Sequence, residues 1–318
     1  MRPVRRERRE TRLYSIRGVR LRWFTLALIG AACIAILLAT MARERTFSLV
    51  ARSLGGTIAF EGELNDWMIQ SGVECRLRDS PDFRMLAARD VSLCDARIYE
   101  ATTFAERIVA WRDGTEIAWR RAASGALQIT VQNDATATIP SGTLIVVPDA
   151  DWRGHGALAF QGIVGIGRTV SSGSDDYLLE GTWQALQSGM AVSIFRDVTD
   201  VVQSGTLTRG SAVDFRRDGA PQDDTAVTSF GHLTPTEDDQ RGVIVTLLTQ
   251  HAPVALRVNH FGLNAPTLFK PDWVDAISSS TMLFAIAVML SLLIGILELG
   301  TAVARQWHGR INPDDDPS

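Results

Sequence analysis

Two long uncharged stretches constrain this chain more than any other feature of its sequence. The first is Trp23–Ala42, and the second is Ala276–Leu297, which could continue to residue 304. An apolar helix of about 20 residues is long enough to cross a hydrocarbon core of about 30 Å. The sequence therefore predicts two transmembrane helices on either side of a large central segment, residues 43–275.

Both stretches carry small residues at every fourth position, and this spacing places them on one face of a helix. Small side chains on one face let two helices approach closely. The residues expected to pack helices together, within one chain or between copies, are Ala27, Ala31, Ala35, Ala39, Ala287, Ser291 and Gly295. Trp23 and Trp273 stand at or just outside the ends of the stretches, where interfacial aromatic anchors are common.

The charges beside these stretches predict an orientation. The arm at residues 1–22 carries nine arginines and two glutamates, and basic residues beside a span mark its cytoplasmic side. We therefore expect the arm and the tail at residues 305–318 in the cytoplasm, and the segment at 43–275 outside it. Lys270 is the only lysine in the sequence, which is typical of a GC-rich genome. The expected location is a bacterial inner (cytoplasmic) membrane, with a periplasmic domain in the cell envelope.

The central segment at residues 43–275 carries more acidic than basic residues. A net negative charge opposes binding to phosphates, so nucleic acid is not an expected partner. Its two cysteines, Cys75 and Cys94, are 19 residues apart, and an oxidising compartment would permit a disulfide between them. Their spacing argues against a zinc site, since the sequence has no Cys-x-x-Cys motif.

Alternation of apolar and polar residues begins near residue 57 and recurs in short runs as far as residue 261. This pattern, with Gly, Asp, Ser or Pro between the runs, is typical of an all-β sandwich, barrel or stacked sheet. Asp113-Gly114 lies between two alternating runs and predicts a hairpin turn, whereas residues 83–105 are ambiguous and could contain one short helix. The predicted fold class is a membrane-anchored, mainly β protein, in which two transmembrane helices flank an exported all-β domain.

The central segment contains no sequence motif for catalysis, cofactor binding or metal binding. Asp149 begins a run like a calcium loop, but Arg153 and Phe160 stand where oxygen ligands are needed. Gly162–Gly167 is glycine-rich, but no helical pattern follows it, which favours a strand with close backbone packing over a phosphate cradle. We therefore predict no catalytic, cofactor-binding or metal-binding residue and no cofactor. A Ser–His–Asp site assembled in three dimensions stays open.

These observations favour a non-enzymatic inner-membrane scaffold or assembly factor for a cell-envelope process. Two anchors would hold the domain close to the membrane, whereas one would suffice for an enzyme that ranges freely. The expected partners are the membrane and other membrane or envelope proteins, bound through helix packing and the β domain, and a homo-oligomer is left open. Two alternatives remain. One is a membrane receptor or regulatory protein that senses an exported ligand, and the other is an envelope-polymer hydrolase whose site is not visible in the sequence.

Overall fold

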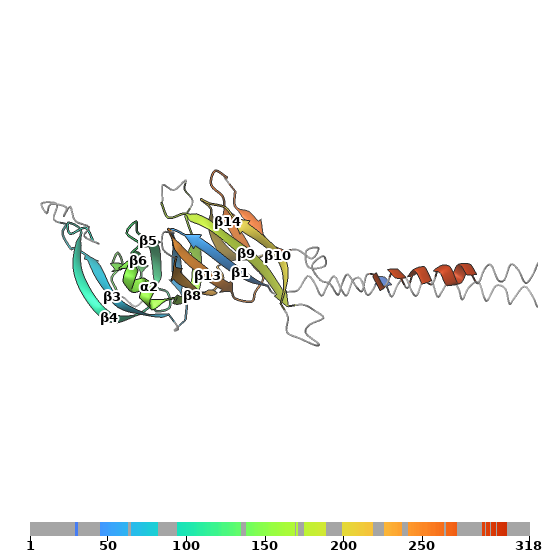
Figure 1. The fold of residues 1–318 in the computed structure, drawn as a ribbon, viewed down its shortest axis with the longest axis horizontal. Coiled ribbons are helices and arrows are strands. Elements are labelled where there is room, and N and C mark those ends of the chain that lie inside the picture. The colour runs from blue at the N-terminus through green and yellow to red at the C-terminus, as the bar shows by residue number, and fades with distance from the viewer. Residues whose placement is uncertain are drawn as a thin grey trace, which may run out of the picture. The chain divides into compact units, whose positions relative to one another are not determined.

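A computed structural model describes most of the central segment (Figure 1). The chain divides into two compact units, of which one is Glu44–Pro271, called the β domain below, and the other comprises the two ends of the chain. The described residues are 29–30, 45–62, 65–81, 94–134, 138–168, 170, 175–188, 199–218, 226–236, 241–263, 265–271, 288–289, 291–292, 294–296 and 298–303.

The described β domain consists of strands and one short helix, α2 (Asp149–His155), and all the strands join one large antiparallel sheet. The strands are β1 (Thr46–Ser53), β2 (Gly55–Phe60), β3 (Asp66–Leu77), β4 (Tyr99–Ala110), β5 (Glu116–Arg121), β6 (Leu127–Asn133), β7 (Leu144–Val147), β8 (Leu158–Ile166), β9 (Leu178–Ser188), β10 (Thr199–Leu207), β11 (Ala212–Arg217), β12 (Ser229–Pro235), β13 (Val243–Thr249), β14 (Val254–Asn259) and β15 (Thr267–Phe269).

Burial with a period of two residues explains why these segments form strands. In β1, Phe47, Leu49 and Ala51 are buried, while the residues between them are half-buried or exposed. Strands β8 and β13 alternate in the same way. Because successive side chains of a strand point to opposite faces, this alternation places one face of each strand in the core.

The sheet branches at β8. Residues Leu158–Gly162 pair with β12, whereas Gly165 and Ile166 pair with β11 on the same side of the strand. The other side of β8 pairs with β2. One branch runs from β12 through β13, β1 and β9 to β10, and the other runs from β11 through β14 to β15.

Aromatic side chains join the two branches in the core. Phe47 on β1 contacts Trp183 on β9 and Phe215 on β11, with ring centroids 5.9 and 6.1 Å apart. Trp183 also contacts Phe269 on β15, at 5.1 Å. Burying a large apolar side chain contributes roughly 1.5–3 kcal/mol, so these rings tie the first strand of the domain to the last.

From β2 the sheet continues through β5, β6, β7 and β3 and ends at β4. Phe60 on β2 contacts Trp67 on β3 and Trp111, with ring centroids 5.7 and 5.4 Å apart. The indole Nε1 of Trp67 donates to the carbonyl of Ala159 at 2.6 Å, and Trp152 of α2 is buried in the same core. Strand β3 is thereby fixed to the middle of the sheet, and Figure 1 shows β3 and β4 as long, curved strands at one end of the β domain.

The prediction of two transmembrane helices flanking the domain is wrong for the described chain. Among the described residues no helix is both long enough and apolar enough to cross a membrane. Most of Trp23–Ala42 and Ala276–Leu297 lies outside the described residues. The prediction rested on length and lack of charge, which allow a spanning helix but do not by themselves show that the chain forms one. For the described residues the fold is corrected to a mainly β domain with one very short helix, and neither membrane anchor is seen among them.

The turn predicted at Asp113-Gly114 is present, but the hairpin is not. Gly114 has a φ of 81°, and the amide of Thr115 donates to the carbonyl of Arg112 at 3.0 Å. Strand β4 before the turn pairs with β3, and β5 after it pairs with β2 and β6. The amide of Gly114 donates to the carbonyl of Phe60, so the turn is attached to β2 and carries the chain from one part of the sheet to another.

Candidate interaction surface on strands β3 and β4

Halfway along the β3–β4 pair, the set of side chains that faces the core changes. On β3, Trp67 and Ile69 are buried in the first half, and Gly72 and Glu74 are buried in the second half. A regular strand would bury every second residue, so the pattern shifts by one residue between Ile69 and Gly72. At the same level of β4 lies Glu106, with a φ of 45°, the one non-glycine residue with a positive φ in the described part of the chain.

The backbone pairing indicates a change at the same place, because β3 and β4 keep one register along their length but the pair of Gln70 with Glu106 is missing from it. The amide of Trp111 donates to the carbonyl of Asn65 at 3.1 Å, and the amide of Arg78 donates to the carbonyl of Ile98 at 2.9 Å. Hydrogen-bonded pairs alternate with non-bonded pairs along an antiparallel ladder. Starting from the bond at Trp111, the residues of β4 that are hydrogen-bonded to β3 are the odd-numbered ones after Glu106. Starting from the bond at Ile98, they are the even-numbered ones before Glu106.

The outer edge of β4 therefore presents its backbone groups in a regular order. Within the run Glu100–Ala105, the even-numbered residues direct their amides toward β3. Ala101, Thr103 and Ala105 direct their amides away from β3. Among the described strands β4 pairs with β3 alone. We call the outer edge of this run the β4 edge.

Local structure sets both limits of the β4 edge. Before it, the amide of Tyr99 donates to the carbonyl of Asp95 at 2.8 Å. After it, the left-handed backbone of Glu106 departs from the extended conformation of a strand. Between these limits the side chains are exposed, apart from half-buried Phe104. An incoming strand would thus meet a short and regular length of backbone whose side chains are mostly exposed.

A buried carboxylate holds the two strands together beside the β4 edge. Glu74 on β3 lies opposite Thr102, and its side chain is only 6% exposed. Its Oε1 accepts from Nε of Arg76 at 2.6 Å, and its Oε2 accepts from Nη1 of Arg107 at 2.5 Å. The guanidinium of Arg107 also lies over the ring of Phe104, 5.6 Å from the centroid, a favourable cation–π geometry.

Opposing effects set the pKa of Glu74. Burial, the largest single effect, raises the pKa, but the hydrogen bonds and charges of Arg76 and Arg107 together outweigh burial. The pKa of Glu74 is therefore lowered from its ordinary value of 4.5. Glu74 is ionised at neutral pH and can hold both arginines in place.

A disulfide anchors the chain that leads into β4. Cys75 on β3 is fully buried and is bonded to Cys94, with the two Cα atoms 6.0 Å apart. Both cysteines pack with Val146 in a second, small hydrophobic cluster. Next to Cys94, the side-chain hydrogen bonds of Arg97 lower the pKa of Asp95 to about 2. The start of β4 is thus held covalently and by an ion pair.

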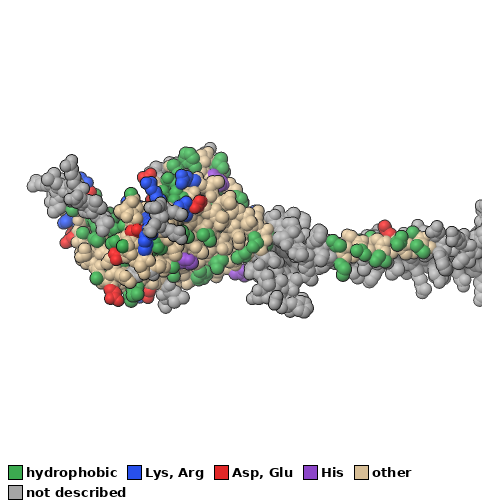
Figure 2. All heavy atoms as spheres, in the orientation of Figure 1, with side chains coloured by type: hydrophobic (Ala, Val, Ile, Leu, Met, Phe, Trp, Pro, Cys, Tyr) green, Lys and Arg blue, Asp and Glu red, His purple; other side chains and the backbone are tan. Residues whose placement is uncertain are grey.

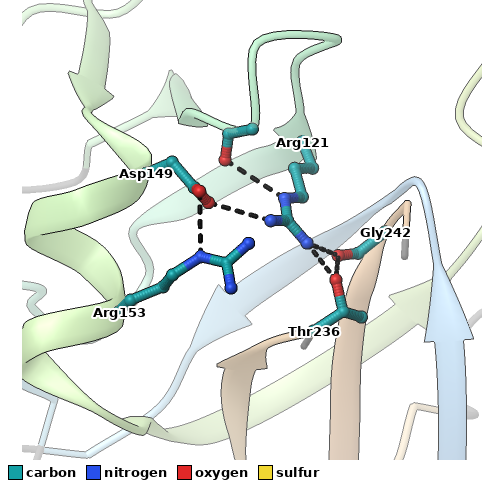
Figure 3. Close-up of polar contacts among 6 residues, drawn as sticks. Arg121, Asp149, Arg153, Thr236 and Gly242 are labelled. Carbon is teal, nitrogen blue, oxygen red and sulfur yellow. Dashed lines mark hydrogen bonds and ion pairs between the residues drawn. The ribbon is translucent and has the colours of Figure 1, made fainter. Parts of the chain in front are cut away.

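A second polar network surrounds Arg121 at the end of β5 (Figure 3). The side chain of Arg121 is 5% exposed, and its Nη2 donates to Oδ1 of Asp149, at the start of α2, at 2.8 Å. Its Nη1 donates to the carbonyl of Gly242 at 2.8 Å and to the hydroxyl of Thr236. Asp149 also accepts from Nε of Arg153 at 2.9 Å. This network is a structural link between β5, α2 and the β12–β13 connection.

Among the residues that the structure describes, a serine–histidine pair lies at the turn between β10 and β11. The Ser211 hydroxyl lies 3.1 Å from Nδ1 of His260, and the amide of Ser211 donates to the carbonyl of Thr208 at 3.3 Å. Ser211 is fully buried, so a substrate could not reach its hydroxyl without a rearrangement. The pair stabilises the turn. Within the described residues, no cluster of three or more His, Cys, Asp or Glu side chains could hold a metal ion.

Several charged side chains of the β domain form ion pairs, some across neighbouring strands and some within one strand. On the face drawn in Figure 2, Lys and Arg side chains lie among Asp and Glu side chains. Asp214 on β11 accepts from Nε of Arg216 at 3.0 Å and from Nη2 of Arg257 at 2.5 Å. Arg52 on β1 lies 2.9 Å from Glu180 on β9. Such exposed pairs contribute little to stability, but they neutralise part of the positive charge of these strands.

The site residues expected from the sequence fall into three groups. Cys75 and Cys94 are brought together, as described above. Ser291 and Gly295 lie in helical residues. The other expected helix-packing residues and anchors lie outside the described residues, and these are Ala27, Ala31, Ala35, Ala39, Ala287, Trp23 and Trp273.

The sequence did not identify the β4 edge, because residues 83–105 show no clear pattern. The available signal was the composition of Glu100–Ala105, in which small and β-branched residues follow one another without proline or lysine. Comparison with protein-family models, with curated proteins and with solved structures finds no match to this chain. A function is therefore inferred from the geometry of the β3–β4 pair.

Proposed function

We propose that the β domain is a non-enzymatic scaffold or assembly module that binds partner proteins by strand addition at the β4 edge. One observation carries this proposal. Ala101, Thr103 and Ala105 direct their amides away from β3, at an end of the sheet where no described strand pairs with them. An exposed edge of this kind accepts an extended segment of another protein through backbone hydrogen bonds.

The side chains of the β4 edge favour strand addition. Natural edge strands are commonly protected by proline, by lysine or by a bulge that twists the edge away. The run Glu100–Ala105 has neither proline nor lysine, and the distortion at Glu106 ends the run without interrupting it. By contrast, the terminal strand β10 has a register shift between Val201 and Gln203, and the terminal strand β15 has three residues.

The β4 edge is also supported from both faces. Glu74 and Arg107 connect β3 to β4 on one face, and the Cys75–Cys94 disulfide anchors the chain before β4 on the other. A backbone that is already held in its binding conformation loses less conformational entropy when a partner docks. The disulfide also fits a compartment outside the cytoplasm, where a cell-envelope partner would be encountered.

The experiment compares two substitutions at one residue. Thr103→Pro removes an outward amide, and its ring occupies the position that an incoming strand would take, while the bonds from β4 to β3 are kept. Thr103→Val is the matched control, because it keeps the amide and nearly the same shape. Each full-length variant is expressed in its native host, crosslinked and purified, and the associated proteins are identified.

We expect the associated proteins to be recovered with the wild type and with Thr103→Val, and to be reduced at least tenfold with Thr103→Pro. Circular dichroism and thermal unfolding of the three proteins check that the fold is kept. Equal recovery with all three proteins would show that partners bind elsewhere. A protein that is solitary in every case would contradict the scaffold.

A further inference from the structure

We propose that one partner of the β4 edge is the same edge of a second copy of this chain. The two β4 strands would pair antiparallel about a two-fold axis that passes beside Thr102. This inference rests on the proposed strand addition and specifies its partner and its register. It is carried by the outward amides of Ala101, Thr103 and Ala105 and by the side chains between them.

Antiparallel pairing requires residues with outward amides to face one another. In a pair centred on Thr102, Ala101 of each copy faces Thr103 of the other, and both residues have outward amides. Ala105 then faces the carbonyl of Tyr99. The amide of Tyr99 is already bonded to Asp95. Its carbonyl accepts from Nε of Arg78 at 3.1 Å, and its second lone pair can accept a further hydrogen bond. Every outward amide of the edge therefore meets an acceptor in this register.

The side chains are self-complementary in the same register. The two Thr102 side chains meet at the axis, and threonine pairs across strands are favourable. Glu100 of each copy lies opposite Phe104 of the other. The guanidinium of Arg107 lies over the ring of that Phe104. Each negative charge thus approaches a positive one, and within the run Glu100–Ala105 no like charges face each other.

The neighbouring register is electrostatically worse. A pair centred on Thr103 would also satisfy the outward amides of Ala101, Thr103 and Ala105, but it would bring Glu100 of each copy close to Glu106, just beyond the end of the other copy's edge. Like charges brought close together across a strand pair destabilise it. Charge therefore selects the pairing centred on Thr102.

Two-fold symmetry also limits the size of the assembly. An interface that uses the same patch on both subunits closes at a dimer. Each copy would use its β4 edge once, so the contact cannot continue into a fibre. The two large sheets would become one continuous sheet, and the β4 edge of each copy would be covered.

The test uses a disulfide at the proposed axis. Cys33 is first replaced by serine, so that Cys75 and Cys94 remain as the native pair. Thr102→Cys would place two thiols at a non-hydrogen-bonded position with Cα atoms about 4.5 Å apart, within the roughly 4.4–6.8 Å that a disulfide needs. Thr103→Cys is the matched control, because its two Cα atoms would be about 7–8 Å apart in this register.

Under mild oxidation at low micromolar concentration, full-length Thr102→Cys should run as a disulfide-linked dimer on a non-reducing gel, at least tenfold more abundant than with Thr103→Cys. Crosslinking of Thr103→Cys in preference to Thr102→Cys would overturn the register. Equal or absent crosslinking of both would overturn the dimer. Tryptophan fluorescence of each variant confirms that the native core is intact before the comparison.

Analytical ultracentrifugation of proteins with the native threonine and with single substitutions provides a second reading. Thr102→Lys would bring two ammonium groups together at the axis and should weaken dimerisation about tenfold or more, whereas Thr102→Val should leave it within about twofold. A wild type that stays monomeric at high micromolar concentration overturns this inference. If Thr103→Pro still reduces the recovery of other partner proteins in that case, the proposed strand addition is kept and only the dimer is rejected.

Discussion

Glu74 is the residue in which burial and charge pairing compete most directly. Its pKa is lowered in the folded state, so the unfolded chain binds more protons there as the medium becomes acidic. The stability that Glu74 contributes is therefore fully present above its ordinary pKa of 4.5. It is lost as the pH falls through the lower pKa of the folded state.

We predict that Glu74→Gln destabilises the β domain by roughly 1–3 kcal/mol at pH 7, because Arg76 and Arg107 lose a charged acceptor. The difference from the wild type should shrink at pH 3, where the wild type is itself losing this contribution. Urea unfolding at both pH values measures the effect. Glu100→Gln, on the exposed β4 edge, is the control and should change stability by less than about 0.5 kcal/mol. A difference for Glu74→Gln that is equal at both pH values would contradict the account.

At the residue scale, the sequence predicted pairings only where few choices existed. Cys75 and Cys94 are the two cysteines of the central segment, so any bridge within it had one connectivity. Glu74 and Arg107 are 33 positions apart, and many other arginines could have paired with this carboxylate. Only the register of β3 with β4 selects Arg107.

At the element scale, β4 shows why some strands are hidden in a sequence. Alternation predicts a strand when one face is buried along its whole length. In β4 the buried side changes at Glu106, and most residues before that point are exposed. Gly162–Gly167 was predictable because its glycines give the segment a clear pattern, which β4 lacks. A Cβ at Gly162 would collide with the backbone of Ala59 on β2, and this close backbone packing was expected from the sequence.

Helix α2 provides a prediction at the same scale. Arg121→Met should destabilise the β domain by roughly 3–5 kcal/mol, because it leaves Asp149 and the acceptors around the former guanidinium without their donor. Arg153→Met is the matched control, since Arg153 contacts the same carboxylate but is 29% exposed, and it should cost about 1 kcal/mol or less. Thermal unfolding of both variants tests this. Equal destabilisation would mean that Arg121 is not the link between β5 and α2.

At the scale of the whole molecule, long-range pairing decides the architecture. The sequence indicated an all-β domain, but short strands at regular spacing do not specify which strands are neighbours. The branch at β8 and the return of β9 to β1 join segments far apart in the chain. The same topology leaves β4 at an end of the sheet. The β4 edge is thus a property of the complete sheet and could not be derived from residues 99–110 alone.

Residue-resolved amide hydrogen exchange of β4, measured by NMR in dilute and in concentrated protein, tests the central claim most directly. In dilute protein we expect the amides of Thr102 and Phe104 to be protected and those of Ala101, Thr103 and Ala105 to exchange rapidly. In concentrated protein the latter three should become protected, while Thr103→Pro should abolish this change at Ala101 and Ala105. Protection of the three amides in dilute protein, or rapid exchange at every concentration and with every bound partner, would contradict strand addition at the β4 edge.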